Sequence, residues 1–566
     1  MKNRFDSATC FWSVTLLIAA LCVSFPAFST GHVIAGGDMP FHLGRIEGIA
    51  AALQAGQFPA RLNPVQAGGY GMPTGIFYPD VFLYIPAVLR LMGMPLLICW
   101  KFTFLVTHIL TAFLSWWAFS VATQSRQTGA MAALFYEVAF YRLVMGYSTM
   151  DIGALLAMAF LPVAIVAVWV TLRRDTAYWP MAVVGSTGVL LSHILSSIFL
   201  LGTVFLMLVL SFRRLARPEV RSAAGRATGF IFLLTIWFYA PLLYFHQHME
   251  YAIRISMKDV WAGMVYPFQA CDFYVGSGML AFVMVLAVIQ FFRHRGTPGL
   301  FWYLLVSALA MAFLISFLPL WQKLGSWVGW LQFPGRLTVF PAIMISVAAA
   351  IGIEQIGLAV RWQRAVAILG ALFVFAENVL WQAGLSYCMP PWTPGYPPLF
   401  ENRMTMTAYW SSIDLGVEGG TTDYMDAVAY RHLMDSWPEF PGMRDKLLRK
   451  EQDRAIVPDD RILNIERMGT TFKMHCMAGE EEWLHLPIFW YMGYAAETEN
   501  GERLPLQRGE DGQVDVRLLP SEEDVSVRVW YEGLPWFHAT DLISWFSLFG
   551  FLYAVACRRK KTYDEV

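Results

Sequence analysis

Long runs of apolar residues alternate with short polar segments over most of this chain. Each run is close to the ~20 residues that a helix needs to cross a bilayer, and a helix satisfies its own backbone hydrogen bonds in lipid. The pattern predicts about twelve membrane-spanning helices, near residues 10–29, 96–122, 129–147, 152–172, 179–195, 197–212, 227–246, 276–292, 299–320, 337–358, 365–386 and 541–557.

Basic residues are concentrated in every second loop between these runs. Cytoplasmic loops are enriched in Lys and Arg, so this alternation predicts that both termini are cytoplasmic. The segments expected outside are 30–95, 148–151, 248–275, 321–336 and 387–540. The basic clusters are Lys2 and Arg4, Arg126, Arg173 and Arg174, Arg213 to Arg226, Arg293 and Arg295, Arg361 and Arg364, and Arg558 to Lys561.

One apolar stretch, residues 77–94, does not fit this alternation. Counting it as a span would place Arg173 and Arg174 outside, and the stretch also contains Asp80 and Arg90. A helix that lies along the outer interface, amphipathic rather than spanning, explains these residues better.

The segment 387–540 has a different composition, because it is polar and strand-like. Val514–Leu518 and Val525–Trp530 alternate apolar and polar residues, and the pairs Asn500-Gly501 and Asp511-Gly512 are typical of tight turns. We expect a small extracytoplasmic β-rich domain here.

The composition agrees with a membrane protein. Of 566 residues, 57% are hydrophobic and 15% are charged, and the mean hydropathy is +0.48. The chain is therefore expected to be an all-α polytopic bundle in the plasma membrane over 1–386, followed by the β-rich domain over 387–540 and by a final helix with a basic tail over 541–566. No P-loop, dinucleotide fingerprint or metal-ligand cluster of Cys and His is recognisable, and nucleic-acid binding has no support.

The first candidate for chemistry follows the first apolar run. Asp38 stands where a helix over 39–55 would begin, and His42 and Arg45 follow at spacings of four and three residues, which places all three on one helix face. A carboxylate at the outer water boundary could act as a base on a membrane-bound substrate. The simpler alternative is a capping Asp on an interfacial helix with a solvated polar face.

Other candidates for substrate binding are Tyr70, Tyr78, Asp80, Asp151, His193 and Arg336. Tyr70, Tyr78 and Asp80 lie in a loop rich in Gly, Pro and aromatic residues, and aromatic faces suit sugar rings. Arg336, at the mouth of the span over 337–358, could bind a lipid phosphate with two parallel hydrogen bonds, or it could simply extend to headgroups. On the simpler interpretation, Asp151 is a helix cap and His193 is a packing residue.

Glu137 and Glu377 are ionisable groups inside predicted spans, where each is expected to face a cavity or a partner. They would favour a transporter over an enzyme.

Several of these motifs resemble one family. GGDMPFHLGRIEGIAAALQAGQFPARL, GYGMPTGIFYPDVFLYIPAVL, LLSHILSS, LQFPGR and HLPIFWYMGYAA are similar to the YfhO-like bacterial membrane proteins, which are often labelled as related to 6-pyruvoyl-tetrahydropterin synthase. That group in turn resembles the GT-C glycosyltransferases. The resemblance implies a sugar taken from a polyprenyl-phosphate donor on the outer leaflet, with the Asp of the first outer loop, here Asp38, acting as base or positioning the acceptor.

The sequence is therefore expected to encode a glycosyltransferase that transfers a sugar from a polyprenyl phosphate or diphosphate to a glycan or glycolipid of the cell envelope. Asp38 would deprotonate the acceptor, His42 and Arg45 would position the donor phosphate or tune Asp38, and Arg336 would hold the lipid phosphate. A divalent metal is compatible with this chemistry, but no second carboxylate close in sequence argues for one. The alternatives are a non-catalytic transporter or handler of lipid-linked polymers, and a membrane scaffold.

Overall fold

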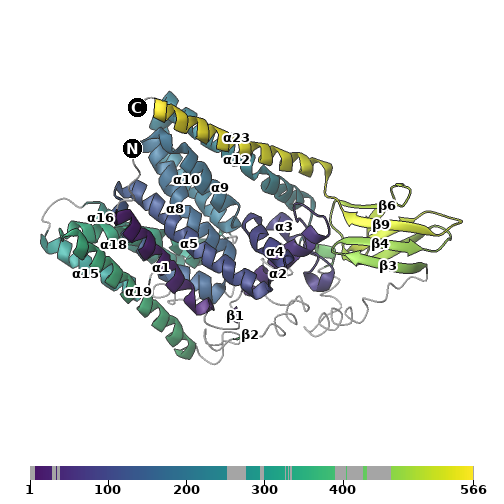
Figure 1. Cartoon of the computed structure of the whole chain (residues 1–566), viewed down its shortest axis with the longest axis horizontal. Helices are drawn as coiled ribbons and strands as arrows, with labels where there is room; N and C mark the ends of the chain where they lie inside the picture. The colour runs from purple at the N-terminus through teal and green to yellow at the C-terminus, as the bar shows by residue number, and fades with distance from the viewer. Residues whose placement is uncertain are drawn as a thin grey trace.

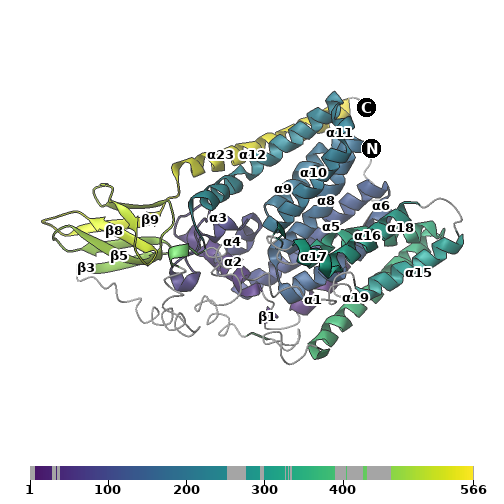
Figure 2. The ribbon, with the colours of Figure 1, turned by 180° about the vertical axis from the view of Figure 1, so that it is seen from behind.

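The computed structural model describes residues 7–28, 33–34, 38–251, 276–293, 299–324, 327–328, 331, 334–388, 403–404, 425–429 and 461–564. Figure 1 shows a helical bundle with a β-rich region at one end of the long axis and both chain termini at the other. The rotated view in Figure 2 shows the same arrangement, with α2, α3 and α4 between the bundle and the strands. The parts of the predicted domain at 405–424 and 430–460 lie outside the described residues.

The described part of the chain has a helix at each of the predicted apolar runs. Within it, six helices are long and apolar enough to cross a membrane: α1 (Ser7–Phe28), α5 (Leu96–Thr123), α8 (Ile152–Arg173), α12 (Pro218–His248), α18 (Val339–Gln355, with the preceding 3-10 turn) and α23 (Pro535–Asp564). The total of twelve crossings stays a prediction, because within the described residues these six helices are the ones found long and apolar enough. The helices at the other predicted runs are α6 (Arg126–Glu137), α9 (Trp179–Leu190), α10 (Ile194–Leu210), α15 (Ser277–Arg293), α16 (Leu300–Ser316) and α19 (Val360–Cys388).

Helices α8 and α9 pack closely because glycines of α9 lie against α8. A Cβ atom on Gly188 would overlap the ring of Phe160 in α8, so a side chain at this position would push the two helices apart. Close approach at small residues is the usual way in which helices associate in lipid, where apolar burial gives no net driving force. This contact fixes the end of α9, and thereby the start of α10, relative to the end of α8 that carries Asp151.

The stretch 77–94 is broken into short pieces. It forms the end of α3 (Thr74–Phe77), a 3-10 turn over Val81–Leu83 and α4 (Tyr84–Leu91). At 1.5 Å per residue, the eight residues of α4 extend for only ~12 Å, which is too short to cross a bilayer. The neighbouring outer helix α2 spans Met39–Gln54, and Gly56 at its C-terminal end has a φ of +81°, as expected for a residue that ends a helix.

The C-terminal region contains two antiparallel sheets that share one apolar core. One has the strand order β3-β4-β9-β6 and the other β5-β8-β7. The predicted strands correspond to β8 and β9, and the turn at Gly512 joins β7 to β8. Strand bounds are β3 Ile462–Met468, β4 Thr471–Cys476, β5 Glu482–Phe489, β6 Tyr494–Thr498, β7 Leu506–Arg508, β8 Gln513–Leu518 and β9 Val525–Tyr531; a separate pair, β1 (Val33–Ile34) and β2 (Arg403–Met404), lies elsewhere.

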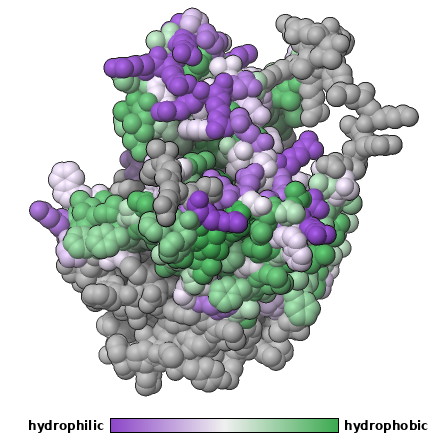
Figure 3. Space-filling model, turned by 90° about the vertical axis from the view of Figure 1, so that its left-hand side faces the viewer, coloured by the Kyte–Doolittle hydropathy of each residue, from purple (hydrophilic) through white to green (hydrophobic). Residues whose placement is uncertain are grey.

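The surface is polar at the end that carries the termini. In Figure 3, hydrophilic residues gather at the top of this end, where Figures 1 and 2 place the C-terminus and α11 (Phe212–Leu215), and a band of hydrophobic residues lies below them. Exposed apolar residues are frequent on the helices, among them Phe205, Phe291, Phe313 and Phe546. An apolar outer surface of this kind is suited to contact with lipid.

The β-rich region contains one histidine whose charge should make its stability depend on pH. In β5, His485 Nδ1 lies 2.7 Å from Asp515 and Nε2 lies 3.1 Å from Asp511. Hydrogen bonding to Asp511, and then to Asp515, raises the pKa of His485 to about 9. A raised folded-state pKa stabilises the fold fully below pH ~6.5, and this contribution is lost as the pH rises through 9.

We therefore expect His485→Gln to lower the unfolding temperature of the full-length protein at pH 6 and to have little effect above pH 9. His475→Gln is the matched control, because His475 lies on the same domain with its nearest carboxylate 3.9 Å away. Thermal unfolding of both variants between pH 6 and 9.5 measures the difference. An effect of His485→Gln that stays constant over this range would contradict the assigned ion pairs.

Candidate active site

Five charged or polar side chains from four separate segments meet in a buried cluster beside the outer helices. His42 and Arg45 come from α2, Asp80 from the segment before α4, Asp151 from the residue before α8, and His193 from the residue before α10. All are at most 7% exposed. We call these five residues the buried cluster. Burial of so many ionisable groups is costly unless each is paired, so their contacts decide the chemistry of the site.

Arg45 organises one half of the buried cluster. Its Nε donates to Asp80 at 2.7 Å, Nη2 donates to the Pro79 carbonyl at 2.8 Å and also contacts Asp80, and Nη1 lies 2.9 Å from His42 Nδ1. Its guanidinium also lies over the ring of Tyr78, 4.0 Å from the centroid. These contacts use all three guanidinium nitrogens, so we assign Arg45 the role of a positioning residue.

The contact between Arg45 and His42 fixes the tautomer of the imidazole. A guanidinium only donates, so His42 Nδ1 must accept and the ring proton must lie on Nε2. That Nε2 lies 3.3 Å from Asp151. His193 is arranged in the same way, because its Nδ1 accepts from the Ser196 amide and its Nε2 lies 3.4 Å from Asp151. Both imidazoles therefore present N–H donors to one carboxylate.

Asp151 is the centre of this arrangement and receives two further donors. The Tyr78 hydroxyl donates at 3.2 Å, and the Ala154 amide donates at 2.9 Å as the N-terminal cap of α8. Burial alone would raise the pKa of Asp151, but the two imidazoles and the Ala154 amide hold it well below its usual range. The carboxylate is therefore ionised although it is buried.

The two imidazoles are correspondingly neutral. Burial lowers the pKa of His42, and Arg45 adds to this effect while Asp151 opposes it. Burial likewise lowers the pKa of His193 to about 4, and after Asp151, which raises it, the next influence is the charge of Arg336. The structure thus brings Arg336, which is half-buried in the 3-10 turn Pro334–Thr338, to the His193 side of the buried cluster.

Local backbone geometry explains how Asp151 reaches this position. The segment Val144–Thr149 is a π-type turn, and Met150 after it has a φ of +56°, which is unusual for a residue with a side chain. Gly153 lies so close to Tyr78 that a Cβ there would be 2.5 Å from the tyrosine hydroxyl. A glycine at this position therefore permits the bond between Tyr78 and Asp151.

The other predicted site residues lie around this centre. Asp38 is at the N-cap position of α2, as predicted, but its side chain makes no capping hydrogen bond. Its backbone amide donates to Thr149 at 2.8 Å, which places Asp38 beside the turn that carries Asp151. Tyr70 stacks on Phe489 of β5, with 4.8 Å between ring centroids, so its ring lies against the β-rich region.

An apolar cavity of about 520 Å³ lies against the same corner of the bundle, and no pattern in the sequence identified it. Its walls come from α8, α9, α12 and α23 and from the turn after Asp80. Val81 and Leu191, which line it, are one and two residues away from Asp80 and His193. Phe82 and Phe160 stack across part of its wall, with 5.2 Å between ring centroids.

A second ion pair, also unforeseen, borders this cavity. Asp541 of α23 lines the cavity and binds Arg61 at 2.6 Å. The guanidinium of Arg61 lies over the ring of Phe537, 4.8 Å from its centroid. The available signal in the sequence was a single acid at the start of the last apolar run, because an ionisable residue in such a position needs a partner.

The two acids inside the helical runs have partners. Glu137 of α6, fully buried, lies 2.5 Å from His108 and 3.6 Å from Arg142. Glu377 of α19 accepts a hydrogen bond from Ser277. Both acids are thus held between helices.

The residues of the buried cluster do not match the needs of a resident metal ion. Among the described residues, no group of three His, Cys, Asp or Glu side chains is arranged to hold one. Each oxygen of Asp151 already faces an imidazole N–H, which a metal would have to displace. We therefore derive no step through a metal.

Comparison with known proteins gives a partial structural likeness. No family model and no curated protein matches the sequence. The archaeal oligosaccharyltransferase AglB from Archaeoglobus fulgidus, in complex with an inhibitory peptide and a dolichol-phosphate, is 12% identical, with a TM-score of 0.39 over 78% of this chain and 69% of that one.

Two further structures of the Archaeoglobus fulgidus oligosaccharyltransferase give similar values. The apo form is 13% identical, with a TM-score of 0.35 over 79% of this chain and 60% of that one. The complex with Zn and sulfate is 14% identical, with a TM-score of 0.35 over 70% and 58%. This chain thus spans about three fifths of the length of these two, and we base the functional proposal on the site geometry.

The four hydrogen-bond donors around Asp151 lead to a prediction about the stability of the protein. Asp151→Asn keeps the shape of the side chain, and Asn caps helices about as well as Asp. The substitution removes the charge, however, and replaces one acceptor oxygen with an NH₂ donor that faces an imidazole N–H. Hydrogen bonds to charged groups contribute about 1.5–3 kcal/mol, so we expect a loss of that order and a clearly lower unfolding temperature.

Asp175→Asn is the matched control for this variant. Asp175 caps the next 3-10 turn through the Ala177 amide at 2.8 Å, and it is exposed. This control should unfold within a degree or two of the wild type, because Asn caps about as well as Asp. Equal unfolding temperatures for Asp151→Asn and Asp175→Asn would show that Asp151 is only a cap.

Proposed function

We propose that this protein is a membrane glycosyltransferase that moves a sugar from a polyprenyl phosphate or diphosphate to a cell-envelope glycan or glycolipid on the outer face of the plasma membrane. The observation that carries the proposal is the meeting of the buried cluster and the apolar cavity at one corner of the bundle. A lipid-linked sugar needs both environments at once, because its chain is apolar while its reacting end is charged and polar.

The apolar cavity is suited to the chain of the donor. Three of the helices that line it, α8, α12 and α23, are long and apolar enough to cross a membrane, so a lipid already in the bilayer would enter it without passing through water. Val81 and Leu191, which line the cavity, lie one and two residues from Asp80 and His193, so one end of the lipid chain would lie close to the buried cluster. A phosphate at this end would lie near Arg336.

Two arginines lie near the point where a donor phosphate would bind. Arg45 pairs with Asp80, whereas the charge of Arg336 acts on His193. Arg45 is committed to Asp80, Pro79 and His42, so Arg336 is the cation we assign to the donor phosphate. A guanidinium binds phosphate through two parallel hydrogen bonds, which also orients the leaving group.

The reaction then proceeds by displacement at the anomeric carbon. An acceptor hydroxyl forms a bond to that carbon while the bond between the carbon and the phosphate oxygen breaks. The hydroxyl proton passes to Asp38, and the electron pair leaves with the phosphate, whose charge Arg336 offsets. Asp151 accepts hydrogen bonds from Tyr78 and the two imidazoles and so keeps these groups in fixed positions beside the reacting atoms. Fixed dipoles of this kind stabilise developing charge in other active sites.

Asp38 is more accessible to water than the other acids of this corner, which suits a group that must exchange protons. It is half-buried, whereas Asp80 and Asp151 are 5% and 6% exposed and bonded to Arg45 and to the two imidazoles. An ionised Asp151 with a strongly lowered pKa is a poor base, so we assign proton transfer to Asp38.

We expect Asp38→Asn to reduce sugar transfer by about 10²–10⁴-fold, the usual contribution of a general base. The assay uses the purified protein in liposomes with a radiolabelled polyprenyl-phosphate hexose and an envelope extract as the source of acceptors. Label that leaves the lipid fraction measures transfer.

Glu47→Gln is the matched control, because Glu47 lies on the same helix but binds Arg90 at 2.6 Å, away from the buried cluster. It should transfer sugar at nearly the wild-type rate. Activity of Asp38→Asn near that of Glu47→Gln would remove Asp38 from the reaction. A wild-type protein that binds the donor but transfers nothing would favour the alternative, a non-catalytic handler of lipid-linked polymers.

A further inference from the structure

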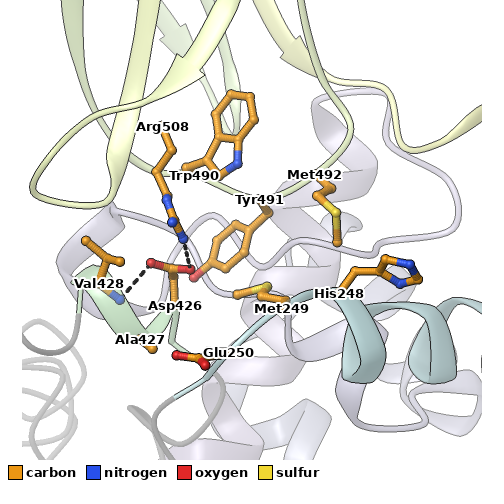
Figure 4. Close-up of a pocket in the computed structure, with 10 residues that line it drawn as sticks. All are labelled: His248, Met249, Glu250, Asp426, Ala427, Val428, Trp490, Tyr491, Met492 and Arg508. Carbon is orange, nitrogen blue, oxygen red and sulfur yellow. Dashed lines mark hydrogen bonds and ion pairs between the residues drawn. The ribbon is translucent and has the colours of Figure 1, made fainter.

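A second cavity, distinct from the buried cluster, lies at the seam between the helices and the β-rich region. Its volume is about 220 Å³, and three segments far apart in the sequence line it. His248 is the last residue of α12 and Glu250 follows it closely, Asp426 lies in the short described segment 425–429, and Trp490 and Arg508 belong to the β-rich region. Figure 4 shows these side chains around the cavity, with Arg508 and Asp426 bonded to each other near its centre.

The polar wall of this cavity is well ordered by its own contacts. Arg508 Nη1 lies 3.1 Å from Asp426 Oδ2, and the other oxygen of Asp426 accepts from the amides of Val428 and Ala429 at 2.9 and 3.3 Å. The Asp426 side chain is 2% exposed, whereas that of Arg508 is 45% exposed. The pair therefore presents guanidinium donors at the mouth of a cavity whose carboxylate lies below.

The apolar wall is aromatic and is joined to the helical bundle. Tyr491 is fully buried, and its hydroxyl donates to the Gly71 carbonyl at 3.3 Å. Trp490, which is half-buried, and the side chain of Met492 complete this wall. An indole and a phenol beside donors and acceptors make a cavity with one apolar face and polar edges.

We infer that this cavity binds one neutral sugar unit of a glycan. A pyranose has an apolar C–H face and an edge of hydroxyl groups that both donate and accept, which matches the two walls. The cavity has room for roughly seven water molecules at ~30 Å³ each, a space that fits one ring rather than an extended chain.

The charges of the lining residues favour a neutral sugar over a phosphorylated one. The positive charge of Arg508 is offset by Asp426, and Glu250 adds a further carboxylate to the wall. An anionic ligand would have to separate the buried Asp426 from its partner and would also face Glu250. Leaving a buried charge without its partner is strongly unfavourable.

The cavity is connected to the buried cluster through one short segment. Tyr251, next to Glu250, pairs with Asp426 as a β-bridge and lies against Phe77, with 4.8 Å between ring centroids. Phe77 directly precedes Tyr78, which binds Asp151. A glycan held in the cavity would therefore lie toward the outer side of the proposed reaction centre. The identification of this glycan as the acceptor rests on the proposed function, whereas the binding of a neutral sugar does not.

Sugar binding can be measured directly with the full-length protein in nanodiscs. The probes are maltotriose, cellotriose and chitotriose as neutral ligands and glucose 6-phosphate as the anionic one, with saturation-transfer difference NMR and calorimetry as readouts. We expect at least one trisaccharide to bind and glucose 6-phosphate to bind more weakly. Trp490→Ala and Arg508→Gln should each weaken trisaccharide binding by roughly tenfold or more, as loss of a central contact residue typically does.

A second tryptophan–arginine pair provides the control. Trp483 and Arg517 lie on the same domain outside the cavity, with the guanidinium 6.0 Å from the indole centroid. Trp483→Ala and Arg517→Gln should bind the trisaccharide as the wild type does. Arg508→Gln decides the question if Trp490→Ala unfolds, because Arg508 is nearly half-exposed and its replacement removes little packing.

Three results would overturn the inference: no trisaccharide binds, the two cavity variants bind like the two controls, or glucose 6-phosphate binds most tightly. The outcome is independent of the transfer assay. Neutral-sugar binding that is lost in the cavity variants, together with a wild type that transfers nothing, would leave the cavity established and the proposed reaction wrong. If sugar transfer depends on Asp38 but no trisaccharide binds, the proposed reaction would stand and the proposed sugar site would be wrong.

Discussion

The structure depends on one buried carboxylate that stays ionised. Asp151 lies at the end of α8, a helix long and apolar enough to cross a membrane, where an unpaired buried charge would be very costly. It is stabilised by the Ala154 amide, the Tyr78 hydroxyl and the N–H groups of His42 and His193. Each of these partners comes from a different segment, so satisfying Asp151 also fixes how α2, α8, α10 and the loop that carries Tyr78 meet. A single electrostatic requirement thereby organises this corner of the bundle.

The same corner has to serve two environments. Toward the helices it borders an apolar cavity of about 520 Å³, and toward the strands it is linked through Phe77 and Tyr251 to a polar cavity of about 220 Å³. A substrate with a lipid chain and a partner made of sugars would approach from these two sides. The proposed function and the proposed sugar site are therefore two consequences of one arrangement, in which a rigid polar centre separates a lipid-like space from a water-facing one.

The sequence predicted the elements better than it predicted their meeting points. Apolar runs and turn pairs located the helices and the strands β8 and β9, because periodicity and turn chemistry are local properties. The contact between His42 and Arg45 was also foreseeable, since helical spacing places them on one face. Asp151 is bonded to His42 and His193, which are both far from it in the sequence. No local pattern could show that the segments carrying these three residues lie together. Nearness in sequence was also no guide to position. Tyr70 and Tyr78 lie in the same predicted loop, yet the ring of Tyr70 lies against β5.

The most direct test of the account is to locate the lipid. A polyprenyl phosphate with a diazirine in its isoprenoid chain, photolysed with the protein in liposomes, should attach to α9 around Thr187–Leu191 and to α23 around Ser544–Leu548, which line the apolar cavity. Unlabelled polyprenyl phosphate should compete, whereas the uncharged polyprenol should compete poorly because Arg336 would have no phosphate to bind. Labelling confined to other helices, such as α15 and α16, or equal competition by the alcohol, would contradict a site that joins this cavity to the buried cluster.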